Sequence, residues 1–330
     1  MSELQSGAEP SLAVATLKPS PAASFPISAA TLRRLGIPLL LFVFSTLTTT
    51  AIGARFMYNF LLGRPPLTSD ADLWPWPWLI LDPGRLALGW PFSLTLLTIL
   101  LTHEFGHYFA CRAHGIRATL PWVLPAPTLS GTAGAIIQIS GRIPSRQALV
   151  DIGAYGPLAG YLASLFAIAA GLLLSHPMPD AARHGILSFG EPLTIQLLAD
   201  LLHTPEFHRL LCHPVLVAGW IGLFVTALNL IPGGQLDGGH ILYALSPFLH
   251  RWTTRLLPVL LLLLGIFVWA GWALWGAILF IPVMRRHPEV SATGPLGPGR
   301  RLACAASLAV FVLTFAAEPF LGNSLLKYLY

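Results

Sequence analysis

Long apolar stretches separated by short polar segments run along most of the chain. They fall at about 36–62, 87–110, 152–175, 213–232, 256–283 and 302–321. A helix rises about 1.5 Å per residue, so each stretch can cross the roughly 30 Å hydrocarbon core of a bilayer. The pattern therefore predicts an all-α polytopic membrane protein with about six transmembrane helices.

The segment 119–150, between the second and third stretches, has a different pattern. Its helix-breaking residues are Pro121, Pro125, Pro127, Gly131, Gly134 and Gly141. β-Branched residues surround them, as in the run Ala-Ile-Ile-Gln-Ile at 135–139. We predict a re-entrant β-hairpin at about 119–142. At membrane depth such backbone requires protein or a water-filled cavity around it.

The first 35 residues lack long apolar runs and are rich in Ala, Ser and Pro. We predict a disordered cytoplasmic tail at 1–35 and one membrane-embedded domain at 36–330. Arg33 and Arg34 directly precede the first apolar stretch, which disfavours a cleavable signal peptide.

Composition agrees with a bilayer location. Of the 330 residues, 55% are hydrophobic and 10% charged, whereas soluble domains average about a quarter charged residues. The net charge of +5 is spread over the ends of the apolar stretches, and no single basic face indicates nucleic-acid binding. The cysteines Cys111, Cys212 and Cys304 are odd in number and widely spaced, which disfavours a disulfide framework.

The basic residues also predict the orientation of the helices. Eight arginines near the ends of the apolar stretches fall on one side, which should be cytoplasmic: Arg33, Arg34, Arg112, Arg117, Arg142, Arg146, Arg251 and Arg255. Under a count of six helices, four more arginines break this rule by falling on the opposite side: Arg285, Arg286, Arg300 and Arg301. Either the first four helices orient the last two, or 256–283 turns back at Gly271. We retain six helices, because that stretch is too short for two full crossings.

A polar cluster, His103-Glu104-Phe105-Gly106-His107, lies near the end of the second stretch. Histidines at i and i+4 share one helix face, so both imidazoles can reach one metal ion, with Glu104 holding a water beside it. Chance would produce this pattern in about 1% of chains of this composition. A lone carboxylate near mid-membrane costs about 2.5–3.5 kcal/mol, which a bound dication offsets. A polar contact between helices is the alternative.

A third ligand is expected, because catalytic zinc commonly has three protein ligands and a free position for water. The fourth stretch ends in Asn-Leu-Ile-Pro-Gly-Gly-Gln-Leu-Asp-Gly-Gly-His at 229–240, and Asp237 is the only acidic residue between Glu206 and Glu289. We predict that Asp237 is the third ligand, with a helix cap as the alternative. Asn229 either donates a hydrogen bond to the oxyanion of a tetrahedral intermediate or packs against other polar groups.

These two motifs together resemble the site-2 protease family of intramembrane zinc metalloproteases. The segments 131–135 and 151–160 are similar to the branch shared by bacterial membrane peptidases and chloroplast homologues, and the resemblance covers about 87–283. It implies one Zn²⁺ per chain, bound by His103, His107 and Asp237, with Glu104 as general base. No PDZ-like insertion separates the two motifs, so we expect no substrate selection by such a domain.

Other residues have weaker claims to a role. Cys111 lies four residues after His107, on the same helix face as both histidines. As a fourth protein ligand it would occupy the metal position needed for water, so we expect it to be a small packing residue. His114 lies either near the metal or at the membrane interface, at the cytoplasmic end of its helix, and His240 either lies near the metal or is a surface histidine.

Two features of the third stretch have structural interpretations. Asp151 is predicted to be the N-cap of its helix. Gly156 and Gly160 form a small-xxx-small pair, which indicates helix packing.

The sequence thus predicts a zinc endopeptidase that hydrolyses peptide bonds within or near transmembrane segments, as in regulated intramembrane proteolysis. Its partners would be a transmembrane protein substrate and the lipid bilayer, with no nucleic acid. A bacterial cytoplasmic membrane is predicted, because the tail lacks a convincing transit peptide. The alternative function is a non-proteolytic membrane zinc-binding protein or transporter. The presence of Glu104 argues against an inactive scaffold, and the scarcity of intramembrane acids argues against transport.

Overall fold

The computed structural model describes residues 29–178, 188–285, 290 and 294–328. Most of the predicted tail at 1–35 lies outside these residues. The principal helices are α1 (Ala29–Leu61), α3 (Trp90–Ala113), α4 (Arg146–Leu174), α6 (Pro214–Asn229), α8 (Pro247–Phe267) and α11 (Pro298–Thr314). The shorter ones are α2 (Trp76–Leu81), α5 (Leu193–Leu202), α7 (Asp237–Leu245), α9 (Gly271–Phe280) and α10 (Pro282–Arg285).

Short strands and 3-10 turns connect these helices. The strands are β1 (Arg117–Ala118), β2 (Trp122–Pro125), β3 (Thr132–Ile136), β4 (Ile139–Ser140), β5 (His176–Pro177) and β6 (Leu210–Leu211). The 3-10 turns are η1 (Asp70–Leu73), η2 (Pro83–Gly89), η4 (Phe207–Arg209) and η5 (Leu325–Tyr328).

Four helical segments in the described chain are long and apolar enough to cross a membrane. They are Gly36–Leu61, Pro83–Ala113, Arg146–Leu174 and Pro247–Phe267. Helices α6 and α11 have 16 and 17 residues, and α9 has 10. The chain is therefore a largely helical membrane protein, and the predicted count of six crossings is not confirmed.

The apolar stretch 256–283 is two helices. Helix α8 ends at Phe267, and α9 runs back along it from Gly271. A Cβ atom added to Gly276 would lie 2.8 Å from the carbonyl oxygen of Pro258, and one added to Gly265 would overlap the backbone of Ala273. These glycines allow the two helices to pack closely. The prediction of one continuous crossing at 256–283 is therefore wrong, and the chain turns back at 268–270.

With this turn, the start of α11 lies on the side that the sequence predicts to be cytoplasmic. The guanidinium of Arg300, at the start of α11, pairs with Asp151 near the start of α4. Arg146, in the first turn of α4, donates to the carbonyl oxygen of Ala244 at 2.7 Å. Arg300 thus lies on the same side as Arg146, and its predicted location on the opposite side is wrong. The reversal at 268–270 thus puts Arg300 on the side that the sequence predicts to be cytoplasmic.

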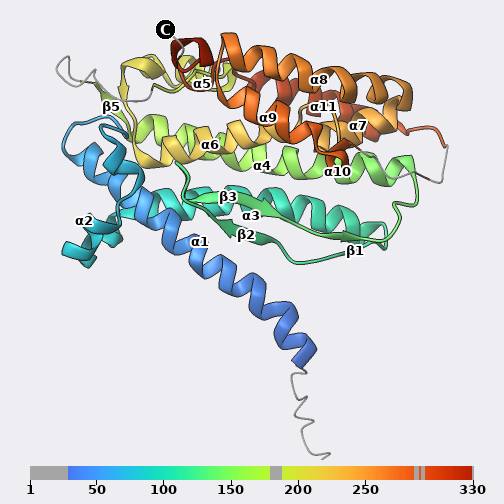
Figure 1. Ribbon diagram of the computed structural model, residues 1–330, viewed down its shortest axis with the longest axis horizontal. Helices are drawn as coiled ribbons and strands as arrows, with labels where there is room; N and C mark the ends of the chain where they lie inside the picture. Colours follow the sequence, from blue (N-terminus) through green and yellow to red (C-terminus); the bar gives the residue numbers. More distant parts are fainter. Residues whose placement is uncertain (1–28, 179–187, 286–289, 291–293, 329–330) are drawn as a thin grey trace, which may run out of the picture.

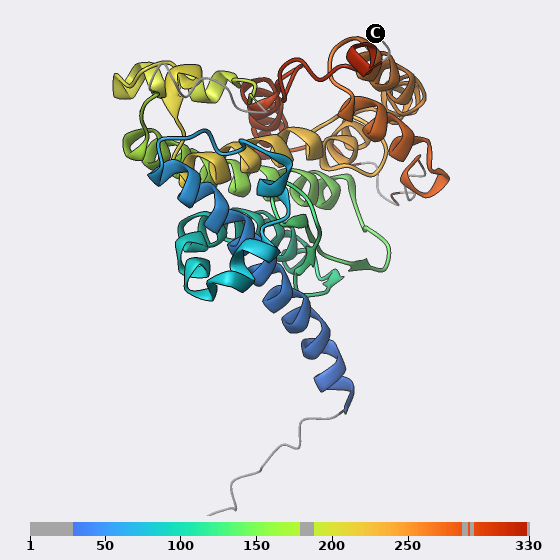
Figure 2. The same cartoon turned by 60° about the vertical axis from the view of Figure 1, so that its left-hand side comes forward.

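Helix α4 is the centre of the fold and contacts α3, α6, α7 and α11. Figure 1 shows α3, α4 and α6 lying side by side, with α1 crossing them obliquely. In both views the N-terminal part of α1 extends away from the other helices (Figure 2). Buried side chains of α3, α4 and α6 form the largest apolar cluster, which includes Leu96, Ile168 and Leu216. The site described below is therefore supported by three tightly packed helices.

Strands β1 to β4 lie between α3 and α4 in the chain, where the sequence pattern predicts a hairpin, and they pack against α1 and α3. Strands β2 and β3 pair antiparallel, with Val123 opposite Ala135, and β1 pairs with β4. Helix α1 holds this hairpin, because Ser45 Oγ donates to the carbonyl of Val123 at 2.9 Å and Thr48 Oγ1 donates to that of Gly131 at 2.6 Å. Gly131 has a φ of 75°, in the region that favours glycine.

Asp151 is not the N-cap of α4, because that helix begins earlier than predicted. Ser145 caps it by accepting a hydrogen bond from the amide of Ala148. The carboxylate of Asp151 is buried within α4 and lies 2.7 Å from both His114 Nε2 and Arg300 Nη2. A buried carboxylate requires such partners, and Asp151 thus ties α4 to the ends of α3 and α11.

Candidate metal centre

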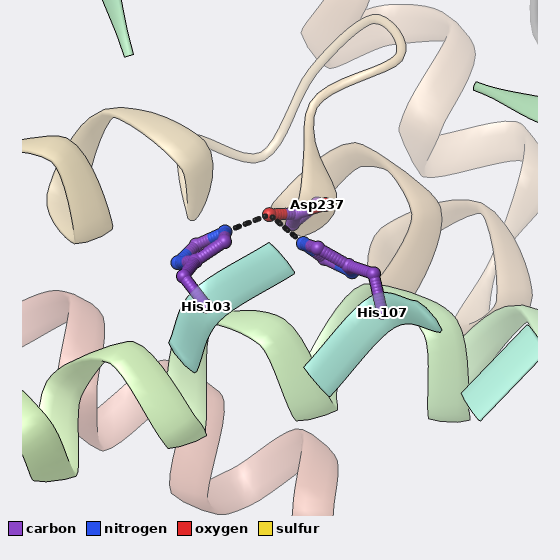
Figure 3. A group of neighbouring side chains, drawn as sticks. All are labelled: His103, His107 and Asp237. Atoms are coloured by element: carbon purple, nitrogen blue, oxygen red, sulfur yellow. Dashed lines mark ion pairs between the residues drawn. The ribbon is translucent and has the colours of Figure 1, made fainter. Parts of the chain in front are cut away.

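Three side chains from two distant segments meet in the interior of the bundle. Asp237 Oδ2 lies 3.4 Å from Nε2 of His103 and 3.3 Å from Nε2 of His107. Figure 3 shows both imidazoles rising from α3 toward Asp237, which begins α7. One ligand atom from each residue lies within 4.8 Å of the others. The structure therefore brings together the three residues that we predicted as metal ligands.

The two histidines are aligned by the helix that carries them. Helix α3 is continuous from Trp90 to Ala113, so His103 and His107 stand one turn above each other. Their rings are 4.9 Å apart between centroids, and the two residues are only 3% and 6% exposed. At this depth, little bulk water can compete for their nitrogen atoms.

Asp237 reaches the histidines because the chain reverses after α6. Gly234 has a φ of 59°, which a residue with a side chain rarely adopts. A Cβ atom on Gly238 would overlap the carbonyl of Leu230, and one on Gly239 would lie 2.6 Å from the carbonyl of Gly233. These glycines let the loop 230–236 fold tightly against itself and start α7 beside the end of α6.

The contact made by His107 Nδ1 determines which of the two ring nitrogens carries the proton. His107 Nδ1 lies 2.7 Å from the carbonyl oxygen of Ile152 on α4. A carbonyl only accepts hydrogen bonds, so in the neutral ring Nδ1 carries the proton and the Nε2 lone pair faces Asp237. This is the state that coordinates a metal, held by the kind of backbone contact typical of histidine ligands. The sequence did not reveal Ile152, because a backbone carbonyl has no residue signature.

The donor set fits a zinc ion. Two imidazole nitrogens and one carboxylate oxygen are the ligands that leave an open position on a catalytic zinc. With the Nε2 lone pair of His107 directed at the Asp237 carboxylate, two electron-rich atoms face each other, and a cation between them removes the repulsion. The group of His103, His107 and Asp237 is the candidate cluster of this kind among the described residues.

Glu104 and Asn229 also lie at the centre. Glu104 is 7% exposed, and the backbone amide of Ile137 in the hairpin interacts with its carboxylate. Asn229 Nδ2 is 3.2 Å from His103 Nε2. Its amide group therefore faces the metal-binding atoms, an arrangement compatible with both roles that the sequence left open for it.

A cavity of about 440 Å³ opens over these groups. One wall is the hairpin segment 135–139, and the other walls include Ile152, Gln235 and His240. His240, for which the sequence left two positions open, thus lies near the metal group. Glu104 lines this cavity together with His103, His107 and Asp237.

Three glycines of α4 are part of the centre, although the sequence indicated only helix packing for Gly156 and Gly160. A Cβ atom on Gly156 would overlap the imidazole of His107, and one on Gly160 would lie 2.9 Å from His103 Nδ1. On Gly153 it would lie 2.9 Å from the Asp237 carbonyl. Their spacing of three and four residues puts all three on one helix face. This spacing is the signal in the sequence by which they could have been assigned to the site.

The remaining candidates lie outside the group. Cys111 is fully buried in an apolar cluster with Ala148 and Ile152, as expected of a packing residue. His114 ends α3 and pairs with Asp151, so it holds helices together away from the metal-binding atoms.

A buried histidine–carboxylate group of this geometry, surrounded by apolar helices, defines the class of membrane-embedded metallopeptidases. Residues 91–267 match the model of peptidase family M50, and the chain belongs to this family, the site-2 protease family. The resemblance inferred from the two motifs is thereby confirmed.

Plant proteins are among the similar sequences. The probable zinc metalloprotease EGY1, chloroplastic, of rice is 32% identical over 236 residues, which are 68% of this chain and 40% of that protein. Its Arabidopsis thaliana counterpart is 38% identical over 159 residues, 45% of this chain and 28% of that protein. Probable zinc metalloprotease EGY2, chloroplastic, of Arabidopsis thaliana is 31% identical over 183 residues, 54% of this chain and 32% of that protein. The matched regions span at most two fifths of these relatives.

Replacing Gly156 by alanine tests the fit between α4 and the histidines. We expect Gly156→Ala to weaken zinc binding by about tenfold or more, since its methyl group displaces the His107 imidazole. Gly160→Ala should have a smaller effect, because its methyl group meets His103 less closely. Zinc affinity would be measured by chelator competition on detergent-purified protein. Gly36→Ala is the control, because its Cβ atom would meet no other atom within 4 Å. Unchanged affinity in Gly156→Ala would contradict the model of the site.

Proposed function

We propose that this chain is an intramembrane zinc endopeptidase that hydrolyses peptide bonds within or near transmembrane segments of membrane proteins. The observation that carries the proposal is the convergence of His103, His107 and Asp237 beside Glu104, in a cavity walled by a hairpin. Membership of peptidase family M50 supports it, as does the similarity to proteins named probable zinc metalloproteases.

His103, His107 and Asp237 would hold one Zn²⁺ per chain. Bound there, zinc would supply a water of lowered pKa and a Lewis acid for the substrate carbonyl. The Ile152 carbonyl keeps the Nε2 lone pair of His107 available for binding. The packed glycine face of α4 holds both rings in place.

Glu104 is the general base in this proposal. It accepts a proton from the attacking water and passes it to the leaving amine. The side-chain amide of Asn229 donates a hydrogen bond to the oxyanion that develops on the substrate carbonyl. Asn229 is suited to this role because its amide nitrogen already faces the centre, at 3.2 Å from His103 Nε2.

The domain organisation belongs to the same proposal. Residues 36–330 form one membrane-embedded domain with its motif core at about 87–283, and 1–35 is a cytoplasmic tail. Helices α6 and α11, at 16 and 17 residues, are close to the lower limit of about 17 for a crossing. With α1, α3 and α4 they make five crossings, and the α8–α9 pair enters the bilayer and turns back as the sixth membrane segment.

The hairpin is proposed to be re-entrant and to receive the substrate. A transmembrane substrate is helical, and its carbonyl groups are hydrogen-bonded within the helix until it unwinds. An unwound segment can add to the hairpin as an extra strand. The segment at 137–138 separates β3 from β4 and lines the cavity, and the backbone amide of Ile137 contacts the Glu104 carboxylate.

The partners in this proposal are a transmembrane protein substrate and the bilayer. The predicted bacterial cytoplasmic membrane gains no support, because the relatives are named as chloroplastic proteins. The alternative function, a zinc transporter or a non-proteolytic zinc-binding protein, is not favoured. Transport requires liganding groups in series, and one such group is found among the described residues.

The substitution Glu104→Gln tests the proposed base. We expect cleavage of a reconstituted single-pass substrate to fall by at least about 100-fold, because the amide cannot accept the water proton. Bound zinc should stay near one per chain, since Glu104 is not a proposed ligand. Asp237→Asn, measured alongside, should lose zinc as well as cleavage. Retained cleavage in Glu104→Gln would exclude the proposed mechanism.

The substitution Ile137→Pro tests the role of the hairpin. Proline removes the amide beside Glu104 and disturbs strand addition, so turnover should fall while zinc content stays unchanged. Ile137→Ala keeps the amide and controls for the lost side chain, and it should retain most of the activity. Equal loss of zinc and turnover in Ile137→Pro would contradict this role, because it would show that the hairpin supports the metal centre and does not bind the substrate.

A further inference from the structure

Helix α8 holds the loop that delivers Asp237 to the metal centre. The amide of Gly234 donates to Thr254 Oγ1 at 3.0 Å, and the carbonyl of Gly234 accepts from His250 Nε2 at 2.9 Å. His250 and Thr254 stand one turn apart on α8, and they are 3% and 8% exposed. Both backbone polar groups of one glycine are thus held by two buried side chains of another helix.

Gly234 is the residue at which this loop reverses. Its φ of 59° turns the chain back, and a Cβ atom on it would lie 2.6 Å from the carbonyl of Met284. The next segment packs directly on it, since a Cβ atom on Gly239 would lie 2.5 Å from the Gly234 carbonyl. Asp237 lies between these two contact points. A shift of Gly234 therefore moves the start of α7 and, with it, the Asp237 carboxylate.

A second contact joins His250 to α7. The ring of His250 packs edge-on against Tyr243, with 5.3 Å between the ring centroids. His250 thus touches the loop before Asp237 and also the helix after it. Metal ligands depend on such outer contacts, and their loss commonly weakens metal binding by 10–100-fold, as an order of magnitude.

We propose that Thr254 and His250 are positioning residues that fix the Asp237 carboxylate opposite His103 and His107 through their hold on Gly234. This inference rests on the proposed function in that zinc is the ion bound. It assigns a role in the centre to α8, a helix that contributes no ligand.

The nearly isosteric substitution Thr254→Val tests this proposal. It removes the acceptor for the Gly234 amide, so we expect the zinc dissociation constant to rise about tenfold. The visible spectrum of the Co²⁺-substituted protein should also shift, because the carboxylate oxygen changes position. Thr254→Ser keeps the hydroxyl and should restore both readouts. Thr253→Val is the matched control, because the Thr253 hydroxyl donates within α8 to the His250 carbonyl at 3.0 Å.

His250→Phe provides a second variant, which removes the other hydrogen bond and keeps a ring against Tyr243. It should weaken zinc binding in the same direction as Thr254→Val. If Thr254→Val and His250→Phe both keep the affinity and cobalt spectrum of the unmodified chain, the inference is overturned and the proposed function stands. A lower melting temperature with unchanged zinc affinity would also overturn it, by showing a purely structural role. Failure of the unmodified chain to bind zinc would overturn the proposed function first, and this inference with it.

Discussion

A carboxylate cannot remain charged in an apolar interior without a counter-charge, and this constraint governs the architecture of the centre. Asp237 and Glu104 both lie among apolar helices, and Asp237 faces the Nε2 atoms of His103 and His107. A single dication shared by His103, His107 and Asp237 satisfies these groups together. Two segments more than a hundred residues apart must then remain in fixed positions, and much of the fold can be understood as the means of holding them.

Helix α4 supplies most of this support. Its glycine face lets α3 approach until the imidazoles lie against the α4 backbone, and the Ile152 carbonyl then orients His107. One residue earlier, Asp151 joins the end of α3 to the start of α11. From the opposite side, α8 secures the loop that carries Asp237. The ligands are thus supplied by α3 and α7, whereas their geometry depends on α4 and α8.

The residues of the metal centre could be predicted from the sequence, but the contacts that hold them in place could not. Histidines at i and i+4 and an isolated aspartate in a glycine-rich loop are patterns of residue type, so their convergence could be predicted. The contacts of Ile152 and Gly234 are made by backbone atoms, which leave no such pattern. Asp151 was misplaced because Ser145 caps α4 six residues earlier than the apolar stretch suggests. Helices α8 and α9 were merged because both are apolar, and hydropathy alone does not register the reversal that Gly265 and Gly276 allow.

X-ray absorption at the zinc K-edge of the purified chain tests the central claim most directly. The account predicts one zinc per chain with a shell of nitrogen and oxygen atoms at about 2.0–2.1 Å, including the outer-shell scattering of two imidazoles. Sulfur ligands at about 2.3 Å, which would point to the cysteines, or a chain that binds no zinc would contradict it.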